Sequence, residues 1–426
     1  MFPKIQTIED VSAWQLCCGC GACAYVCPNE IEMIDTLEYG RRPQFKDGAS
    51  GERDGLAMKV CPGIELTRVS KTEGQVGGQR FFDIWGSVLG VWEGYAADPE
   101  IRFEGSSGGA ATALGLFALE RLGMHGILHV RSRQDVPYLN RTVLSKTREE
   151  LLAATGSRYA PASPCDSLKQ IEDAPGPCVF VGKPCDVAAL SKAMRLKPSL
   201  HEKVGLTIAF FCAGTPSTQG TLNMIQQMGI TDLSSIISLR YRGHGWPGMA
   251  TAEYKVDGQV QSSELTYEQS WGEILQKYRQ WRCYICPDHI GEYADITVGD
   301  AWHRSLTENQ PGRSVLIART VRGKEVLEQL CLSSFVEGEA VPAEVLWSCR
   351  PGQAKHQGAL WTRTVTLKAM HIPAPKYQGF RLFKLCRREL SIKEKMRSLL
   401  GTSKRVFVKE LYRRHNPTAL IVKRNV

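Results

Sequence analysis

At 426 residues the chain is long enough for two or three domains, and its 43% apolar and 23% charged residues are typical of a globular protein. The net charge of +9 comes from the C-terminal end, where residues 376–426 hold 15 Lys or Arg against three Asp or Glu, so the rest of the chain is close to neutral. No apolar run approaches the ~20 residues that cross a bilayer and no basic-then-apolar segment opens the chain, so we expect a cytoplasmic protein rather than a membrane-spanning or secreted one.

The first motif along the chain is a run of cysteines. Cys17, Cys20, Cys23 and Cys27 follow the spacing C-x2-C-x2-C-x3-C-P, which is typical of ferredoxins that bind 4Fe–4S clusters. A zinc site is the less favoured alternative, because zinc sites more often use well-separated C-x2-C pairs. Fifteen clustered cysteines without an export signal also favour thiolate-bound metal over disulfides. We therefore predict a ferredoxin-like 4Fe–4S module over residues 1–75.

The fourth ligand of this cluster is left open between two cysteines. In two-cluster ferredoxins the cysteine before the proline binds the other cluster. Here only Cys61, followed by Pro62, remains of a second run. This logic favours Cys61, whereas Cys27 could replace it if the loop is rearranged. Cys18 is expected to be a bystander.

Residues 90–345 alternate strand and helix signals after a glycine-rich stretch, 76–90, that reads as a linker. We predict a mixed α/β domain with halves at about 90–175 and 176–345. The small residues 105–109 open a helix whose free N–H groups could seat a phosphate, although an ordinary helix start is an equally good interpretation. The loop 156–161 brings polar, aromatic and cationic side chains together.

Four cysteines of this domain stand at positions suited to a second metal site. Cys185 and Cys212 each follow a predicted strand, at the edge where α/β sheets place functional groups. Cys283 and Cys286 form a C-x2-C pair that can supply two ligands of a tetrahedral or cubane site. Taken alone, the pair could be redox-active or bind zinc, and cluster ligation is only slightly favoured. The cysteines without a motif are expected to be buried apolar residues: Cys165, Cys178, Cys331, Cys349 and Cys386.

Residues 373–426 are predicted to form a basic helical tail in which Leu, Ile and Val recur at roughly helical spacing. A solvated helix is the simplest interpretation, and binding to an anionic membrane surface or an acidic partner is the alternative. No recognised DNA- or RNA-binding motif occurs, so we expect no nucleic-acid partner. The expected fold thus combines α+β and α/β parts: a ferredoxin-like module, a mixed α/β domain and the tail.

Several of these motifs together resemble the coenzyme F420 hydrogenase/dehydrogenase beta-subunit family, whose relatives include hydroxymethyl chlorophyll a reductase and the ferredoxin-dependent divinyl chlorophyllide reductase. The resemblance covers roughly residues 15–335. Beyond the first cysteine run it is carried by Ser107-Gly108-Gly109, Gly156-Ser157-Arg158-Tyr159, Gly182-Lys183-Pro184-Cys185, Cys212-Ala213-Gly214-Thr215-Pro216-Ser217, Cys283-x2-Cys286-x-Asp288 and Ala294-Asp295-Ile296-x2-Gly299-Asp300.

The resemblance implies two 4Fe–4S clusters and a flavin, with FAD expected rather than FMN. The core cluster would be bound by Cys185, Cys212, Cys283 and Cys286. The flavin-binding residues implied by the family are Ser107, Gly108, Gly109, Ser157, Tyr159, Asp300 and Ser314.

The function implied is that of an oxidoreductase. We expect electrons to pass from ferredoxin or a similar donor through the clusters to FAD and on to an organic or cofactor acceptor, such as a deazaflavin. Arg158, His244 and Trp246 are the candidate catalytic residues around the acceptor. Two alternatives stay open: a non-catalytic electron-relay subunit of a larger hydrogenase- or dehydrogenase-type complex, and a reductase associated with polysaccharide biosynthesis.

Overall fold

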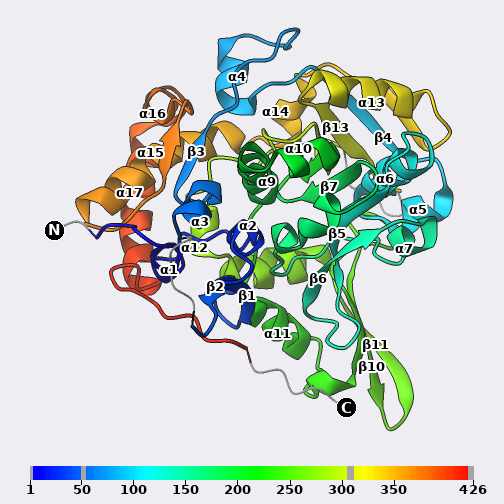
Figure 1. Ribbon diagram of the computed structural model, residues 1–426, viewed down its shortest axis with the longest axis horizontal. Helices are drawn as coiled ribbons and strands as arrows, with labels where there is room; N and C mark the ends of the chain where they lie inside the picture. The colour runs from blue at the N-terminus through cyan, green and yellow to red at the C-terminus, as the bar shows by residue number, and fades with distance from the viewer. Residues whose placement is uncertain (1–2, 49–53, 305–310, 421–426) are drawn as a thin grey trace.

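The computed structural model describes residues 3–48, 54–304 and 311–420. Its centre is an eight-stranded mixed sheet with the strand order β14-β4-β13-β12-β8-β7-β5-β6 (Figure 1). The strands are β4 (Gly90–Ala96), β5 (Gly126–Ser132), β6 (Asn140–Ser145), β7 (Cys178–Gly182), β8 (Val204–Phe210), β12 (Ile296–Asp300), β13 (Ser314–Ala318) and β14 (Val336–Ala340). The predicted mixed α/β fold is confirmed.

The middle of this sheet is parallel and its two sides are antiparallel. Strands β12, β8, β7 and β5 pair in parallel, whereas β6 on one side and β13, β4 and β14 on the other run antiparallel to their neighbours. All five residues of β13 are buried, as expected of a strand covered on both faces. The carboxyl ends of four parallel strands therefore meet at one edge, which is where the candidate site lies.

Successive side chains of the strands enter two different apolar cores. Val179 of β7 packs with α6 (Ala110–Glu120) and α13 (Val321–Cys331) on one face. Phe180, its neighbour, packs on the other face with α9 (Pro184–Leu196) and α10 (Pro198–Lys203). This alternation follows from the period of two in a strand.

The N-terminal segment packs into that second core. It contains α1 (Ile8–Ala13), α2 (Ala22–Val26), the hairpin β1 (Ile31–Thr36) and β2 (Gly40–Phe45), α3 (Asp54–Val60) and β3 (Glu65–Thr67). Val11, Leu16 and Tyr25 belong to the same cluster as Leu190 of α9 and Trp281. The domain boundary at residue 75 stays a prediction.

The segment 76–90 is not the open linker that its glycines predicted. It holds α4 (Gln79–Trp85), whose Phe81 and Trp85 are buried against Trp347. Aromatic burial outweighs the low helix propensity of the surrounding glycines.

A smaller antiparallel sheet extends from the body as a long hairpin (Figure 1). Its strands are β9 (Ile236–Arg240), β10 (Ala250–Val256) and β11 (Gln259–Leu265), and α11 (Thr218–Gln227) packs beside them. The short connecting helices are α5 (Pro99–Glu104), η1 (Ser106–Gly109), α7 (Arg148–Leu152), η2 (Pro164–Ser167), α8 (Lys169–Glu172), η3 (Leu233–Ser235), η4 (Glu268–Ile274), η5 (Leu275–Tyr278), α12 (Trp281–Tyr284) and α14 (Val345–Cys349).

The C-terminal part is helical and returns to the N-terminal segment. It consists of α15 (Gln353–Ala369), β15 (Lys376–Gln378), α16 (Leu382–Glu389) and α17 (Ile392–Val408). Strand β15 pairs in parallel with β3. Beyond α17, the His415 N–H donates to the Ala13 carbonyl and the Leu420 N–H to the Asp35 carbonyl. Within residues 3–48, 54–304 and 311–420, no helix combines the length and apolar character needed to traverse a bilayer.

We predict that His129 makes the sheet acid-sensitive. It is buried on β5 with Nε2 2.8 Å from Ser145 Oγ, and burial lowers its pKa to about 4. Because this value lies below the ~6.5 of an unfolded chain, the associated stability is full above pH 6.5 and is lost as the pH falls. From pH 7 to pH 5 the loss should be about 2 kcal/mol. In His129→Gln, the free energy of unfolding measured in urea should fall by correspondingly less between pH 7 and pH 5.

The exposed His201 on α10 provides the control. His201→Gln should keep the wild-type dependence on pH. An equal loss of stability in His129→Gln and wild type would contradict the assignment.

Candidate functional site

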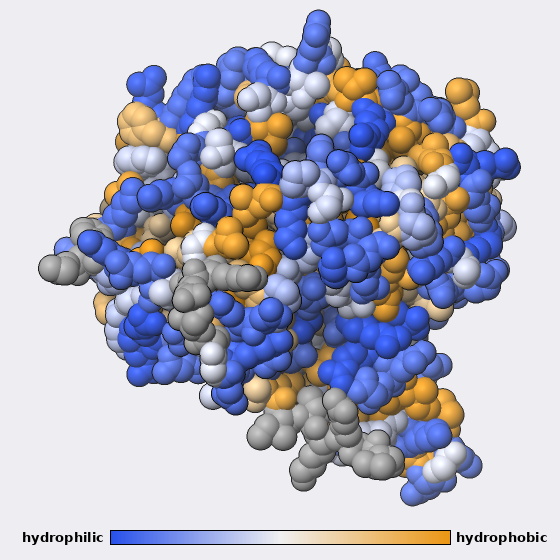
Figure 2. Space-filling view, viewed as in Figure 1, coloured by the Kyte–Doolittle hydropathy of each residue, from blue (hydrophilic) through white to orange (hydrophobic). Residues whose placement is uncertain are grey.

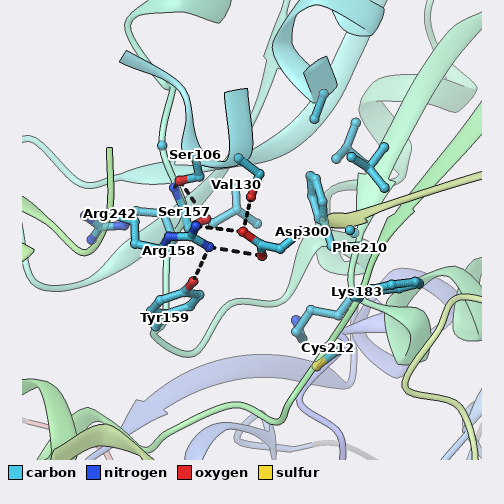
Figure 3. Close-up of a pocket in the computed structure, with 18 of the residues that line it drawn as sticks. Ser106, Val130, Ser157, Arg158, Tyr159, Lys183, Phe210, Cys212, Arg242 and Asp300 are labelled. Carbon is cyan, nitrogen blue, oxygen red and sulfur yellow. Dashed lines mark hydrogen bonds and ion pairs between the residues drawn. The ribbon is translucent and has the colours of Figure 1, made fainter. Parts of the chain in front are cut away.

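A cavity of about 350 Å³ lies at the carboxyl edge of the central sheet. Each parallel strand contributes a residue near, at or beyond its carboxyl end: Val130 from β5, Lys183 after β7, Phe210 from β8 and Asp300 from β12 (Figure 3). Ligands of α/β proteins bind at this edge because the loops that follow parallel strands meet there. The volume is in the range of small-molecule sites.

A turn of small residues, η1, forms one wall. Ser107, Gly108 and Gly109 all have positive φ angles, 54°, 76° and 69°, and lead into α6. A Cβ atom on Gly108 would lie 2.2 Å from the Gly312 carbonyl oxygen, and one on Gly109 would lie 2.3 Å from that of Ile101. Both positions therefore require glycine. Successive N–H groups in such a turn, at a helix start, suit a phosphate.

An ion pair between Arg242 and Asp300 closes this wall. The guanidinium donates to both carboxylate oxygens at 2.7 and 3.1 Å, and Trp246 Nε1 adds a third bond at 3.1 Å. Ser107 Oγ also donates to Asp300. Burial alone would raise the pKa of Asp300, but Arg242 and these hydrogen bonds outweigh it and hold the pKa below its usual value. The aspartate therefore stays charged and orients its donors.

Most of the predicted flavin-binding residues meet at the cavity. Ser107, Gly109, Ser157, Tyr159, Asp300 and Ser314 line it, and Gly108 lies inside the turn. Ser157 bonds Ser106 Oγ through its N–H at 3.0 Å and its hydroxyl at 2.9 Å. Segments more than 150 residues apart are thus brought together, although flavin binding by these residues stays a prediction.

The candidate catalytic residues are placed differently from one another. Arg158 lines the cavity, but its guanidinium is bound to Asn140 Oδ1 at 2.8 Å and to backbone carbonyls. His244 is 43% exposed, contacts Glu104 and Phe103, and is not among the residues that line the cavity. Trp246 is not among the described lining residues and contacts the site through its hydrogen bond to Asp300. Catalytic roles for the three stay predictions, with Arg158 placed as a positioning group.

Sequence reasoning missed three cations at this site. Arg242, Lys183 and Arg350 line the cavity. Lys183 Nζ lies 2.6 Å from Asp186 Oδ2, and Arg350 donates to the Cys212 carbonyl at 2.9 Å. Lys183 lies in the motif Gly182-Lys183-Pro184-Cys185, from which the sequence predicted a role for Cys185 alone. Arg242 and Lys183 are each paired with an aspartate, so the positive charge left for an anionic ligand comes from Arg350 and Arg158.

Cys349 is a further residue that its sequence context did not predict. It lines the cavity, its Sγ is 3.1 Å from His303 Nδ1, and His303 Nε2 is 3.0 Å from the buried Glu93. Burial raises the pKa of Cys349 to about 12, so the thiol stays protonated at neutral pH. The order thiol, imidazole, carboxylate gives the cavity a group that can exchange a proton.

The N-terminal cysteines surround a second, small cavity. It is lined by Cys17, Cys18, Cys20, Cys23 and Cys61. Cys27 is 1% exposed and is not among the lining residues that the structure describes. The Gly19 N–H donates to Cys17 Sγ at 3.3 Å, a contact typical of cluster-binding loops. The donor set fits a cubane cluster, and the structure favours Cys61 over Cys27 as the fourth ligand.

Two of the core cysteines also accept hydrogen bonds from backbone N–H groups, as Cys17 does. The Gly214 N–H donates to Cys212 Sγ and the Thr215 N–H to Cys283 Sγ, both at 3.3 Å. Burial, with Cys283 alongside, raises the pKa of Cys212 to about 11, so the thiols need a positive ion or cluster to become thiolates. In the described part of the chain no three Cys, His, Asp or Glu side chains are grouped as for a single metal ion.

Cys18, expected to be a bystander, lies close to both groups of cysteines. Its thiol is hydrogen-bonded to that of Cys185, and it also lies near Cys283 and Cys286. The interaction between the two thiols lowers the pKa of Cys18 and raises that of Cys185. Cys18 also lines the N-terminal cavity, so it joins the two groups of cysteines.

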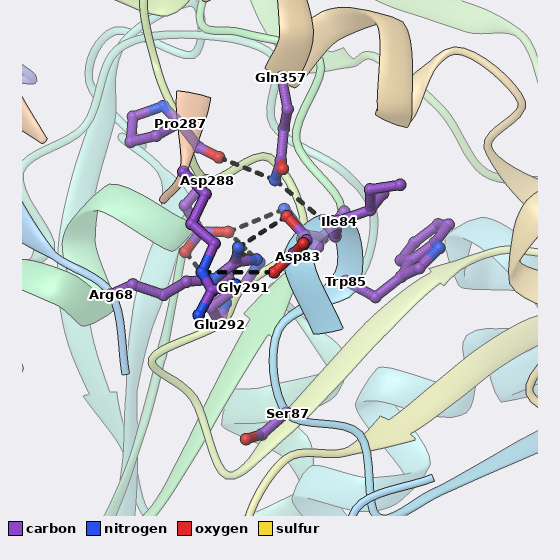
Figure 4. A network of polar contacts seen from close by, with 12 residues as sticks. Arg68, Asp83, Ile84, Trp85, Ser87, Pro287, Asp288, Gly291, Glu292 and Gln357 are labelled. Carbon is purple, nitrogen blue, oxygen red and sulfur yellow. Dashed lines mark hydrogen bonds and ion pairs between the residues drawn. The ribbon is translucent and has the colours of Figure 1, made fainter. Parts of the chain in front are cut away.

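The loop after Cys286 is held by a buried polar network (Figure 4). The Asp288 carboxylate accepts three N–H bonds of 2.7 to 3.0 Å from residues 290–292. Glu292 then forms a bidentate pair with Arg68, at 2.8 and 2.7 Å. Arg68 and Glu292 are almost fully buried, so the pair anchors the C-x2-C loop to the segment after Cys61.

Comparison with known proteins gives a consistent set of relatives. Residues 91–169 and 177–343 match the N-terminal and C-terminal parts of the coenzyme F420 hydrogenase/dehydrogenase beta subunit. The chain is 25% identical to the coenzyme F420 hydrogenase subunit beta of Methanosarcina barkeri, covering 58% of this chain and 80% of that one.

It is 24% identical to a subunit of the F(420)H(2) dehydrogenase of Methanosarcina mazei, over 73% of this chain and 84% of that one. It is also 24% identical to the coenzyme F420-dependent sulfite reductase of Methanocaldococcus jannaschii, over 76% of this chain but only 48% of the relative. A chain in the F420-reducing [NiFe] hydrogenase complex from M. barkeri aligns with a TM-score of 0.48 and 21% identity, over 76% of this chain and 93% of that one.

We predict that Cys61 and Cys27 differ in their effect on iron content. Cys61→Ser should remove the N-terminal cluster and lower the iron of anaerobically purified protein by about four atoms per chain. Cys27→Ser should keep it, because Cys27 lies outside the lining of the cavity. Iron and sulfide assays with electron paramagnetic resonance measure this. Loss of the cluster in Cys27→Ser alone would reverse the assignment.

We predict that Arg242 is needed for flavin retention. Arg242→Gln leaves the Asp300 carboxylate buried without its cation, a change that costs about 3–5 kcal/mol in comparable pairs. FAD should then bind at least about tenfold more weakly in a fluorescence titration. The control is Arg240→Gln, because Arg240 pairs with the partly exposed Glu104 instead. Equal FAD affinity in wild type and Arg242→Gln would exclude this role.

Proposed function

The chain belongs to the coenzyme F420 hydrogenase/dehydrogenase beta-subunit family, and we propose that it is an electron-transfer oxidoreductase with two 4Fe–4S clusters and a flavin, FAD rather than FMN. One observation carries the proposal. Cys212 belongs to the core cysteines and also lines the cavity at the sheet edge, while Cys18 joins the core cysteines to the N-terminal ones. The cysteines and the cavity therefore form one continuous path.

The ligands proposed for the N-terminal cluster are Cys17, Cys20, Cys23 and Cys61, and those for the core cluster are Cys185, Cys212, Cys283 and Cys286. When bound, such clusters carry single electrons and a flavin exchanges them for a hydride equivalent. The residues of the chain supply position and charge. Asp300 and Arg242 would orient the flavin, and the η1 turn would receive its phosphates.

Around the acceptor, the chain would supply charge and a proton. Arg350, which has no carboxylate partner among the described ion pairs, favours an anionic ligand. Cys349 holds a proton close to the cavity, with His303 behind it to restore that proton from solvent. The buried apolar walls of the cavity would exclude water from the exchange.

The relatives favour the electron-relay form of this function. Two of the three are named as subunits of an F420 hydrogenase and an F(420)H(2) dehydrogenase, and the third as an F420-dependent sulfite reductase. We therefore infer that the chain works with other subunits and that a deazaflavin is its first acceptor to test. A self-contained reductase that takes electrons from ferredoxin, with an acceptor in polysaccharide biosynthesis among the options, is the second candidate.

Anaerobic purification tests the cofactors. We expect about eight iron and eight sulfide per chain, and one flavin, with broad absorbance near 400 nm. Protein that contains neither sulfide nor flavin would exclude the proposal.

Turnover of the isolated chain then separates the two forms. Reduced methyl viologen with coenzyme F420 as the acceptor should give F420 reduction if the deazaflavin is the acceptor. Reduced ferredoxin should support no turnover if partner subunits are required. Rapid turnover with ferredoxin and no F420 reduction would instead establish the second candidate.

A further inference from the structure

Helix α17 presents a row of large apolar side chains to solvent. Ile392, Met396, Leu400 and Phe407 are 79%, 50%, 65% and 64% exposed, and Val408 at the end of the helix is 70% exposed. Spacings of four, four and seven residues place the first four in one stripe along the helix. On the left of the view in Figure 2, where α15 to α17 lie in Figure 1, orange apolar side chains interrupt the polar surface.

Another side of α17, about 120° around the helix axis from the stripe, is fixed to the body of the protein. Thr402 and Val406 are fully buried, and Ser398 Oγ lies 2.6 Å from the Thr362 hydroxyl of α15. The N-terminus is closed by a capping box between Ser391 and Glu394. The apolar stripe is therefore the outward face of a docked and capped helix.

A row of exposed cations runs beside the apolar row. Lys393 and Arg397 each follow an apolar position by one residue, or about 100° around the helix, and Lys404 lies about two turns beyond Arg397 in the same row. Among the ion pairs of the described residues, none involves these three. The one acidic residue of α17, Glu394, is paired with Lys355 at 2.7 Å. The outward face is thus apolar on one side and positive on the other.

We propose that α17 binds to the surface of a bilayer that contains anionic lipids. The apolar row would enter the boundary between headgroups and acyl chains, and the three cations would meet lipid phosphates. The charge pattern favours this partner: three cations without an ion pair flank the apolar row, and the one carboxylate of the helix, Glu394, is already paired with Lys355. The helix lies outside the residues matched to the family, 91–169 and 177–343.

Binding there would bring the N-terminal cysteines toward the membrane side. Beyond α17 the chain crosses α1: Arg414 pairs with Asp10, and the His415 N–H donates to the Ala13 carbonyl. Gln15, two residues before Cys17, donates to the Lys409 carbonyl at 3.0 Å. A membrane-bound electron carrier could thus reach the N-terminal cysteines directly. The inference does not depend on the identity of the acceptor.

Vesicle flotation of the full-length protein, purified anaerobically, tests the proposal. The protein should float with vesicles of phosphatidylcholine and about 30% phosphatidylglycerol, and at least about tenfold less with phosphatidylcholine alone. Ile392→Ser/Leu400→Ser/Phe407→Ser should lose binding at all salt concentrations. The variant Lys393→Gln/Arg397→Gln/Lys404→Gln should bind vesicles about tenfold more weakly at low salt. The loss of binding should be smaller at high salt, where charges are screened.

Two matched controls lie on other surfaces. Leu332→Ser removes a side chain that is 90% exposed, and Lys146→Gln/Lys255→Gln/Lys277→Gln removes three exposed charges. Both should bind as wild type does. Failure of wild type to float, or equal losses in the controls, would overturn the proposal. So would a change from dimer to monomer in the apolar variant, since the stripe would then be an interface between copies.

Discussion

The ion pair between Arg242 and Asp300 fixes the geometry of the cavity at the sheet edge. The Arg242 side chain is almost fully buried and that of Asp300 mostly so, and an unpaired charge in such a place would cost several kcal/mol. The pair therefore ties the end of β12 to the segment after β9. Through the hydroxyl of Ser107 it also holds the glycine turn that starts α6. Three segments that are distant in sequence are thus held at fixed distances from one another, because the Asp300 carboxylate accepts hydrogen bonds from Arg242 and from Ser107.

Buried cations that bond neutral oxygens join the N-terminal segment to the α/β body. Arg282 and Arg42 are buried beside the cysteines, and each also bonds the other part of the protein. Arg282 donates to the Pro62 carbonyl at 3.0 Å, and Arg42 donates to Gln280 Oε1 at 3.0 Å. The cations that face the thiols are therefore also the links that set how far apart the two groups of cysteines lie.

Much of the site could be predicted from the sequence because its residues occur in local motifs. The glycine turn, the strand ends and the C-x2-C pair each follow from spacing, and the structure brings them to one edge. The partners of these motifs could not be predicted in this way. Arg242 lies in a segment with no motif of its own, and its role depends on a carboxylate 58 residues later. Cys18 looked redundant because its neighbour, Cys185, is distant in the chain and the fold alone brings the two together.

The pairing of β3 with β15 has a consequence for how the protein is made. Residues 65–67 leave the ribosome early, but the strand that completes their edge is synthesised roughly 310 residues later. The tail that crosses α1 emerges later still. Until then the first cysteine run lacks part of the structure around it, so a cluster bound there would be enclosed only once the C-terminal part has been made.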